Sequence, residues 1–245
     1  MAAQFRLYRL ILFCLCALFV PSLSFAQAPT DSLFADTHFS AKENLLPTSL
    51  LVAGSVLVAF PDFNHKLSAD FPETHIKVDD YLQYSPMLGM YIADIAGVKA
   101  KNSVWNQTKY LAFSQLTCAV VAQTLKYTVR EQRPNAGARN SFPSGHTSVA
   151  FVGATVLYHE FKETNKPIAY SGFVVATAIG ALRVTNRKHW VSDVLAGAGI
   201  GILSTNLIYY LEPFKNWQPF SKSDKIAFSP YYDANSAGLS LALKL

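Results

Sequence analysis

The chain reads KYTVREQRP at residues 126–134, PSGH at 143–146 and RVTNRKHWVSD at 183–193. These three clusters are polar, whereas the stretches around them are rich in Ala, Val, Leu and Gly and favour helices. Together the clusters place several cations and two histidines within a short part of the chain. An oxyanion with three or more negative oxygens is the simplest ligand that explains all of them.

The first two clusters predict converging positive charge. Lys126 precedes Arg133 by seven residues, or two helical turns, so both side chains are expected on one helix face. Ser144 is the natural N-cap of the next helix, which leaves the amides of Gly145 and His146 as unpaired donors at the positive end of the helix dipole. A helix start of this kind binds anions.

The third cluster predicts a reactive histidine. Asp193 follows His189 by four residues, so its carboxylate can accept the ring N–H and fix the tautomer, while the other ring nitrogen stays free to attack. Arg183 adds a further cation to the same cluster. Each cluster alone also fits a solvated basic pair, a helix-start turn or a surface ion pair. Their occurrence together favours an anion site.

The series Lys-x6-Arg-Pro, Pro-Ser-Gly-His and Arg-x5-His-x3-Asp resembles the signature of the type 2 phosphatidic acid phosphatase (PAP2) superfamily. That superfamily also includes bacterial class A acid phosphatases and vanadium haloperoxidases. Two departures from the pattern stand out. Leu182 occupies a position where the third motif usually has Ser, which removes a possible hydrogen bond, and only eight residues separate Pro134 from Pro143, which implies a small, open cap over the site.

The resemblance implies a role for each motif residue. His189 would be the nucleophile that forms a phosphohistidine, Asp193 would orient it, and His146 would protonate the leaving alkoxide and later activate water. No metal or other cofactor is implied, and the histidines outside the motifs form no ligand-spaced cluster. The phosphate oxygens would be bound by the remaining motif residues, which are Lys126, Arg133, Ser144, Gly145 and Arg183.

Three charged residues outside the motifs have less specific interpretations. Asp79 and Asp80 precede a helical stretch, and we expect them to serve its N-terminus. Arg139 lies in the loop between the first two motifs, where it can contact a phosphate or a headgroup, or simply be solvated.

The apolar and amphipathic stretches along the chain predict an all-α fold. A chain of 245 residues with 51% hydrophobic and 15% charged residues is too apolar for the disordered class. With the resemblance, it predicts a six-helix PAP2-type bundle over residues 46–211 that is embedded in or associated with a membrane. Most of the expected helices are shorter than the roughly 20 residues of a straight span. They are Leu46–Phe60, Met87–Val98, Tyr110–Val129, Thr147–Phe161, Ile168–Val184 and Trp190–Leu211.

The two ends of the chain carry different signals. Residues 1–26 combine a basic start, an apolar run and a Ser-Phe-Ala site, and therefore predict a signal peptide cleaved after Ala26, with an uncleaved anchor helix as the alternative. Residues 27–45 are expected to form a polar lead segment. Residues 212–245 form a tail in which alternating leucines predict a short β-hairpin.

Charge distribution bears on partners and location. The formal charge is +5, but no block of five or more basic residues occurs, so nucleic acid is not an expected partner. Lysines are frequent in the loops 99–109 and 162–166, which the positive-inside rule places in the cytoplasm. The motifs would then face the periplasm of a bacterial cell envelope, beside the membrane.

These observations lead to three hypotheses of function. The first is a metal-independent phosphatase that hydrolyses phosphate monoesters or pyrophosphates of envelope lipids, such as phosphatidic acid, phosphatidylglycerophosphate, undecaprenyl pyrophosphate or lipid A. The second is a non-specific periplasmic acid phosphatase acting on small phosphomonoesters. The third is a vanadate-dependent haloperoxidase, against which the short loop between the first two motifs argues because it leaves little room for a halide site.

Overall fold

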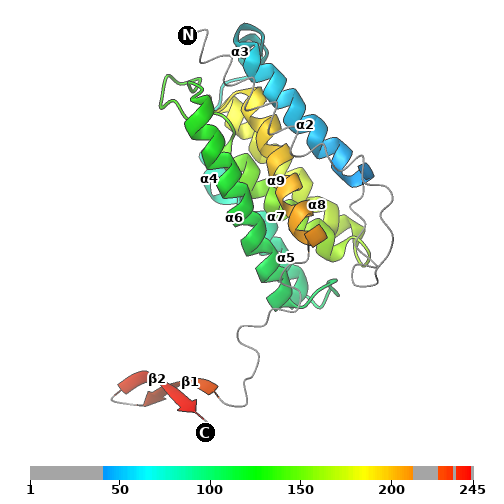
Figure 1. Ribbon diagram of the computed structural model, residues 1–245, viewed down its shortest axis with the longest axis vertical. Coiled ribbons are helices and arrows are strands. Elements are labelled where there is room, and N and C mark those ends of the chain that lie inside the picture. Colours follow the sequence, from blue (N-terminus) through cyan, green and yellow to red (C-terminus); the bar gives the residue numbers. More distant parts are fainter. Residues whose placement is uncertain (1–40, 212–225, 234–235, 244–245) are drawn as a thin grey trace, which may run out of the picture. The chain divides into compact units, whose positions relative to one another are not determined.

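The computed structural model describes residues 41–211, 226–233 and 236–243, and its contacts divide the chain into two units after Leu211. The described part of the first unit is all-α, as expected (Figure 1). Its eight helices are α2 (Ala41–Ala59), α3 (Pro61–Ala69), α4 (Asp79–Leu82), α5 (Ser85–Ile95), α6 (Val104–Val129), α7 (Gly145–Phe161), α8 (Lys166–Thr185) and α9 (Val191–Leu211).

The expected six helices correspond to α2 and to α5 through α9, but the count of six was too low. It omits α3, which starts at Pro61 after a sharp bend of 107° from α2, and α4, which is four residues long. Both are too short and too polar to show a clear apolar period. α6 also begins earlier than expected, because Ser103 accepts a hydrogen bond from the amide of Asn106 at 3.4 Å and caps the helix.

Helices α7 and α9 form the centre of the bundle. α9 packs against α2, α6 and α7, while α8 packs mainly on α7. Two glycines of α9 permit the close approach to α7. A Cβ atom at Gly197 would lie 2.7 Å from the carbonyl oxygen of Ser144, and one at Gly201 would lie 2.6 Å from that of Ser148. Gly197 therefore allows the start of α7 to rest directly against α9.

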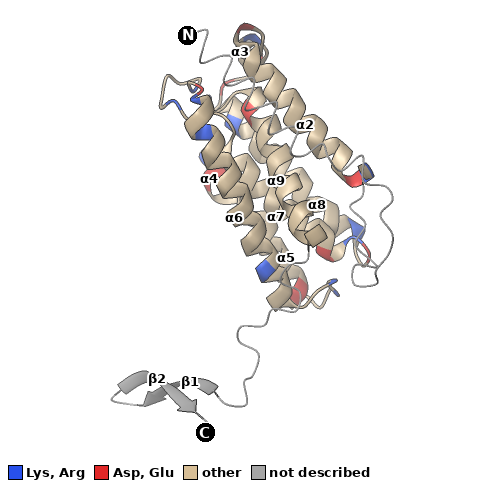
Figure 2. Cartoon of the chain, in the orientation of Figure 1, with Lys and Arg blue, Asp and Glu red and all other residues tan. Residues whose placement is uncertain are grey.

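The charged residues of the bundle gather toward the two ends of the helices (Figure 2). Helices α8 and α9 are long and apolar enough to cross a membrane, and the bent pair α2 and α3 would make a third span if the two are counted as one. Large apolar side chains such as Ile92, Leu116 and Val174 are well exposed on three different helices. Such a surface suits a hydrocarbon environment.

The second unit contains two strands, β1 (Ile226–Asp233) and β2 (Ser236–Leu243). They pair antiparallel, with Phe228 opposite Leu241. Three expected segments lie outside the described residues. They are the signal peptide, residues 27–40 of the lead segment and residues 212–225 of the tail. The last five residues of that lead segment, 41–45, belong to α2.

Candidate active site

The three polar clusters meet at one end of the bundle, where α6 ends, α7 begins and α8 is joined to α9. Hydrogen bonds tie them together. The backbone amide of Ser144 donates to the carbonyl of Asp193 at 3.0 Å, which joins the second cluster to the third. The ammonium of Lys126 donates to the carbonyl of Pro143 at 2.6 Å, which joins the first cluster to the second. The predicted convergence is therefore present in the fold.

A buried histidine and aspartate form the core of the site. Nδ1 of His189 lies 3.3 Å from Oδ2 of Asp193, and both side chains are almost fully buried. Burial lowers the pKa of His189 to about 4, against the opposing effect of Asp193. His189 is therefore neutral near pH 7. Because Nδ1 makes the contact with the carboxylate, Nε2 is the nitrogen that can attack a substrate.

Asp193 is held in place by more than the histidine. Its Oδ2 accepts hydrogen bonds from the backbone amide of Trp190 at 2.8 Å and from the hydroxyl of Ser141. Ser141 also lies 3.4 Å from Nδ1 of His189, so it touches both members of the pair. No motif marked Ser141 in the sequence, because it lies in the loop before Pro143 and reaches the pair only through the fold.

Helix α3 fixes the start of α9. The side-chain amide of Asn64 donates to the hydroxyl of Ser192 at 2.8 Å, and its carbonyl accepts from the backbone amide of Ser192 at 3.2 Å. The hydroxyl of Ser68 accepts from the amide of Val191 at 3.0 Å. These bonds satisfy backbone amides of the first turn of α9, which have no partner within the helix. By fixing the first turn of α9, they fix the position of Asp193 beside His189.

The two aspartates of α4 turn toward the site. Nη1 of Arg183 donates to Asp79 at 2.7 Å and to Asp80 at 3.1 Å, and Arg183 and Asp79 are nearly fully buried. The interpretation of these acids as helix-start residues was therefore incomplete: they lie in the first turn of α4, but their carboxylates bind Arg183. Nε of Arg183 is buried without a hydrogen-bond partner among the described residues. That donor is available to a bound anion.

His146 also contacts the carboxylate of Asp80. Its Nε2 is 3.0 Å from Oδ1 of Asp80, which also accepts from Arg183. Burial and the neighbouring Arg183 lower the pKa of His146 below 6.5, while Asp80 and Asp79 oppose the shift. The imidazole of His146 remains partly exposed, unlike that of His189. A partly exposed histidine beside a carboxylate can exchange protons with substrate and water.

The start of α7 matches the expected anion site. Ser144 is the N-cap residue, but its hydroxyl accepts from Thr147 at 2.9 Å and makes no capping bond to the helix. The hydroxyl of Ser144 thus does not occupy the first amides of the helix. Space is open beside Gly145, where an added Cβ atom would meet nothing within 4 Å. An anion can therefore approach the amides of this turn.

Lys126 and Arg133 converge by a different route from the expected one. α6 ends at Val129, and Arg130 takes the left-handed conformation (φ 51°), so Arg133 lies in the following loop and not on a shared helix face. Asn140 joins the two cations. Its carbonyl accepts from Nζ of Lys126 at 2.9 Å, and its side-chain oxygen accepts from Nε of Arg133 at 2.9 Å. Burial and the neighbouring Arg133 lower the pKa of Lys126 to about 8.

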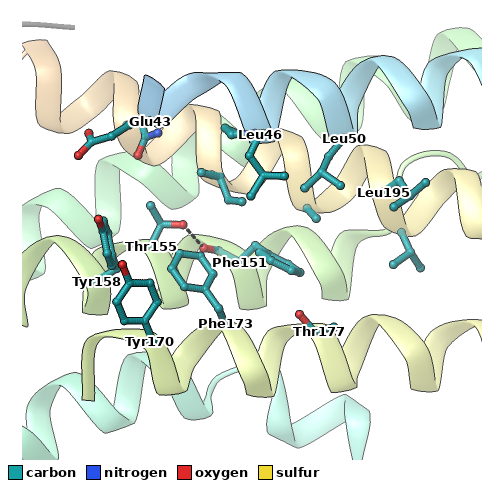
Figure 3. A pocket seen from close by; sticks show the side chains of 15 residues that line it. Glu43, Leu46, Leu50, Phe151, Thr155, Tyr158, Tyr170, Phe173, Thr177 and Leu195 are labelled. Carbon is teal, nitrogen blue, oxygen red and sulfur yellow. Dashed lines mark hydrogen bonds between the residues drawn. The ribbon is translucent and has the colours of Figure 1, made fainter. Parts of the chain in front are cut away.

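An apolar cavity of about 580 Å³ lies along the bundle between α2 and α8, over α7 and α9 (Figure 3). Leu46 and Leu50 of α2 face it from one side, and Phe173 of α8 faces it from the other. Val194, which follows Asp193 in the chain, also lines it. The cavity therefore begins close to the polar site and continues along the apolar part of the bundle.

Metal ligands are not grouped in this site. Within residues 41–211, no three His, Cys, Asp or Glu side chains are arranged to hold a metal ion. The charged groups gathered here are Lys, Arg and His side chains together with the carboxylates of Asp79, Asp80 and Asp193. The geometry thus brings cations, helix-start amides and a buried His–Asp pair together at one end of a helical bundle.

Comparison with known proteins gives matches of the same kind. Residues 107–217 match the model of the PAP2 superfamily. The lipid A 1-phosphatase of Porphyromonas gingivalis is 33% identical over 180 residues, which are 71% of this chain and 40% of that protein. The chain therefore spans less than half the length of this relative.

Two crystal structures align with part of the chain. Aquifex aeolicus LpxE aligns with a TM-score of 0.44 and 24% identity, covering 62% of this chain and 93% of the other. The first transmembrane PAP2 type phosphatidylglycerolphosphate phosphatase from Bacillus subtilis aligns with a TM-score of 0.46 and 20% identity, covering 72% of this chain and 99% of the other.

Proposed function

We propose that this protein is a metal-independent phosphatase that hydrolyses phosphate monoesters or pyrophosphates of envelope lipids through a phosphohistidine intermediate. The observation that carries the proposal is the buried pair of His189 and Asp193 at the point where Lys126, Arg133 and Arg183 converge. A neutral histidine oriented by a carboxylate is a nucleophile, and the surrounding cations stabilise the charge of a transferring phosphoryl group.

The first step transfers the phosphoryl group to the enzyme. Nε2 of His189 attacks the phosphorus, the bond from phosphorus to the lipid oxygen breaks, and His146 donates its proton to that oxygen. Asp193 accepts the Nδ1 proton in a hydrogen bond and stabilises the positive charge that develops on the imidazole. The phosphoryl oxygens are bound by the cations and by donors at the start of α7, namely Lys126, Arg133, Arg183, Ser144 and Gly145.

The second step returns the enzyme to its starting state. His146, now neutral, takes a proton from water, and the resulting hydroxide attacks the phosphorus while the bond to Nε2 of His189 breaks. Inorganic phosphate leaves, and His146 is protonated again. Asp80 is placed to support both proton transfers, because its carboxylate lies against Nε2 of His146 and favours the protonated form.

Three observations support a lipid as the substrate. The relative from P. gingivalis is named a lipid A 1-phosphatase. Helices α8 and α9 can span a membrane and lead directly into the site. The apolar cavity between α2 and α8 extends from Val194 beside the site and suits an acyl or prenyl chain (Figure 3). A substrate with a phosphate at the site and a hydrocarbon chain in the cavity would use both surfaces.

We also propose that the site faces the periplasm. Lys101 and Lys162 lie at the end of the bundle opposite the site, where the backbone amide of Lys101 donates to the carbonyl of Glu160. Basic residues at that end favour its placement in the cytoplasm. In this proposal residues 46–211 are the phosphatase domain and 212–245 a tail.

Phosphate release tests the proposal directly. Purified protein in detergent with EDTA would be assayed on phosphatidic acid, polyprenyl pyrophosphate, lipid A and a small phosphomonoester. A clear preference for a lipid, absent in His189→Ala, is the expected result. Equal turnover of the small ester would favour a general acid phosphatase, and bromide oxidation with added vanadate would favour a haloperoxidase. Phosphate release that survives in His189→Ala would overturn the mechanism.

A further inference from the structure

A second, basic pocket lies beside the proposed catalytic site. It has a volume of about 290 Å³, and we call it the arginine pocket. Its lining residues include three cations and no acid. None of these cations forms an ion pair within 4.0 Å in the part of the chain that the structure describes. The lining residues are Gln123, Lys126, Tyr127, Arg130, Arg139 and Asn140.

The arginine pocket shares a wall with the catalytic site. Lys126 and Asn140 line it, and the same two residues bond to each other and to Pro143 and Arg133 of the motifs. A ligand group in the arginine pocket is therefore separated from the proposed position of the reacting phosphate by the Lys126–Asn140 contact. The two places are therefore neighbours across one pair of residues.

Arg130 is held in a specific position at this pocket. Its φ of 51° lies in the left-handed region, which a residue with a side chain rarely adopts. Its Nε donates to the carbonyl of Tyr127 at 3.1 Å, so the guanidinium is anchored on one side. The terminal nitrogens remain for a ligand. This conformation makes Arg130 the C-cap of α6, a common way for a helix to end, and it fixes where the side chain leaves the helix.

Arg139 adds the second guanidinium. It lies in the short loop between the first two motifs, next to Asn140, and its side chain is exposed. Arg139 acts on the carboxylate of Glu131 through space, but Glu131 pairs with His65 at 3.5 Å and forms no ion pair with Arg139 within 4.0 Å. The reacting phosphate already has three cations at the catalytic site. Arg130 and Arg139 are thus additional positive charges, which the single-phosphate mechanism does not use.

We infer that the arginine pocket binds a second phosphoryl group, so that the preferred substrate carries two phosphates. This inference rests on the proposed function. Guanidinium groups bind phosphate oxygens through paired, charge-assisted hydrogen bonds, which fits a pocket with two arginines and a lysine. The second phosphoryl group belongs to a pyrophosphate or to a separate position on the same lipid. A free phosphate ion or a neighbouring anionic lipid has the same chemistry, and the test distinguishes these sources.

The test compares substrates that differ only in the second phosphate. Arg130→Gln and Arg139→Gln would be assayed on a polyprenyl pyrophosphate and the matching monophosphate, and on lipid A with two phosphates or one. Each variant is expected to lose about ten-fold in kcat/KM on a bisphosphorylated substrate, as for a lost hydrogen bond to a charged group. Turnover of the monophosphates should stay within about two-fold. Lys166→Gln, which removes a charge at the opposite end of α8, is the matched control.

Other outcomes would overturn the inference. Equal losses of kcat/KM on mono- and bisphosphorylated lipids, or no loss on either, would show that the pocket does not bind a second phosphate. A loss that appears only when anionic lipid is added to the micelles would assign the pocket to a neighbouring lipid, and a change only in inhibition by inorganic phosphate would assign it to the free ion. Binding of the bisphosphate by His189→Ala, with and without Arg139→Gln, measures the pocket independently of turnover and so separates its failure from that of the phosphatase proposal.

Discussion

The carboxylate of Asp80 lies 3.0 Å from Nε2 of His146, which joins helix α4 to the first turn of α7. The same oxygen accepts a hydrogen bond from Arg183 at 3.1 Å. Asp80 is exposed enough to be displaced by a substrate, whereas Asp79 beside it is buried against Arg183. Asp79 therefore balances the buried guanidinium, while Asp80 opposes the lowering of the His146 pKa by burial and by Arg183.

Asp80→Asn should lower the pKa of His146 further, because Asp80 opposes the downward shift caused by burial and by Arg183. Less His146 is then protonated at a given pH, so the loss of kcat/KM on the alkaline side should begin at a lower pH. The pH–rate profile measures this shift. Asp70→Asn, which changes an exposed acid at the end of α3, is the control and should leave the profile unchanged. If the alkaline side of the profile of kcat/KM against pH were the same in Asp80→Asn as in the wild type, the role of Asp80 would be contradicted.

The native enzyme should be most active in mildly acidic solution. His189 must be neutral to attack, which holds above its pKa of about 4. His146 must be protonated to donate, which holds below its pKa, and that pKa is lowered from 6.5. The value of kcat/KM should therefore form a bell with its maximum between these limits. A profile that is flat from about pH 4 to pH 8 would argue against both assignments.

His189→Ala should reduce turnover by several orders of magnitude, because it removes the nucleophile. Thermal unfolding in detergent should show that the variant remains folded. Lipid phosphate should still bind, since the cations are intact. Gradual loss of activity in proportion to a lower melting temperature would instead indicate a structural role for this histidine.

Gly197→Ala should disturb the site from the side of α9. The added Cβ atom would lie 2.7 Å from the carbonyl oxygen of Ser144, a backbone atom that cannot move alone. We expect destabilisation of about 1–3 kcal/mol, typical of overpacking, and a loss of activity of about ten-fold or more. Gly89→Ala is the matched control, because a Cβ atom there meets nothing within 4 Å. Thermal melts and phosphate release check both variants, and equal behaviour of the two would contradict the packing argument.

Thr177→Trp tests the apolar cavity. Thr177 lies on α8 among the residues that line the cavity (Figure 3), so a bulky side chain there should fill it. Turnover of a long-chain lipid phosphate should fall by about ten-fold or more, while a small phosphomonoester should be hydrolysed as before. Val174→Trp places the same side chain on the outer face of α8, where Val174 is 71% exposed, and should have little effect. Similar losses on both substrates would show that the cavity does not hold the chain.

Local sequence was sufficient for the positions of α7, α8 and α9 and for the contact between His189 and Asp193. The apolar stretches that correspond to α7, α8 and α9 differ from those helices by only one or two residues at their boundaries, because each has a long apolar run between clear polar ends. The contact of His189 with Asp193 was also predictable, since the two lie four residues apart. Such short-range patterns do not require knowledge of the fold.

The contacts that only the tertiary structure decided join residues far apart in the chain. Arg183 meets Asp79 across 104 positions, and Asn64 meets Ser192 across 128. Sequence periodicity misplaced even the nearby residues Lys126 and Arg133. Both were expected on one helix face, but α6 ends at the left-handed residue Arg130, so Arg133 lies in a loop. Periodicity reports which face of one element a residue occupies, but not which distant element packs against it. The sequence by itself therefore determined the long apolar helices and the set of motif side chains, while packing decided where the short helices α3 and α4 lie and which acids and amides surround the motif side chains.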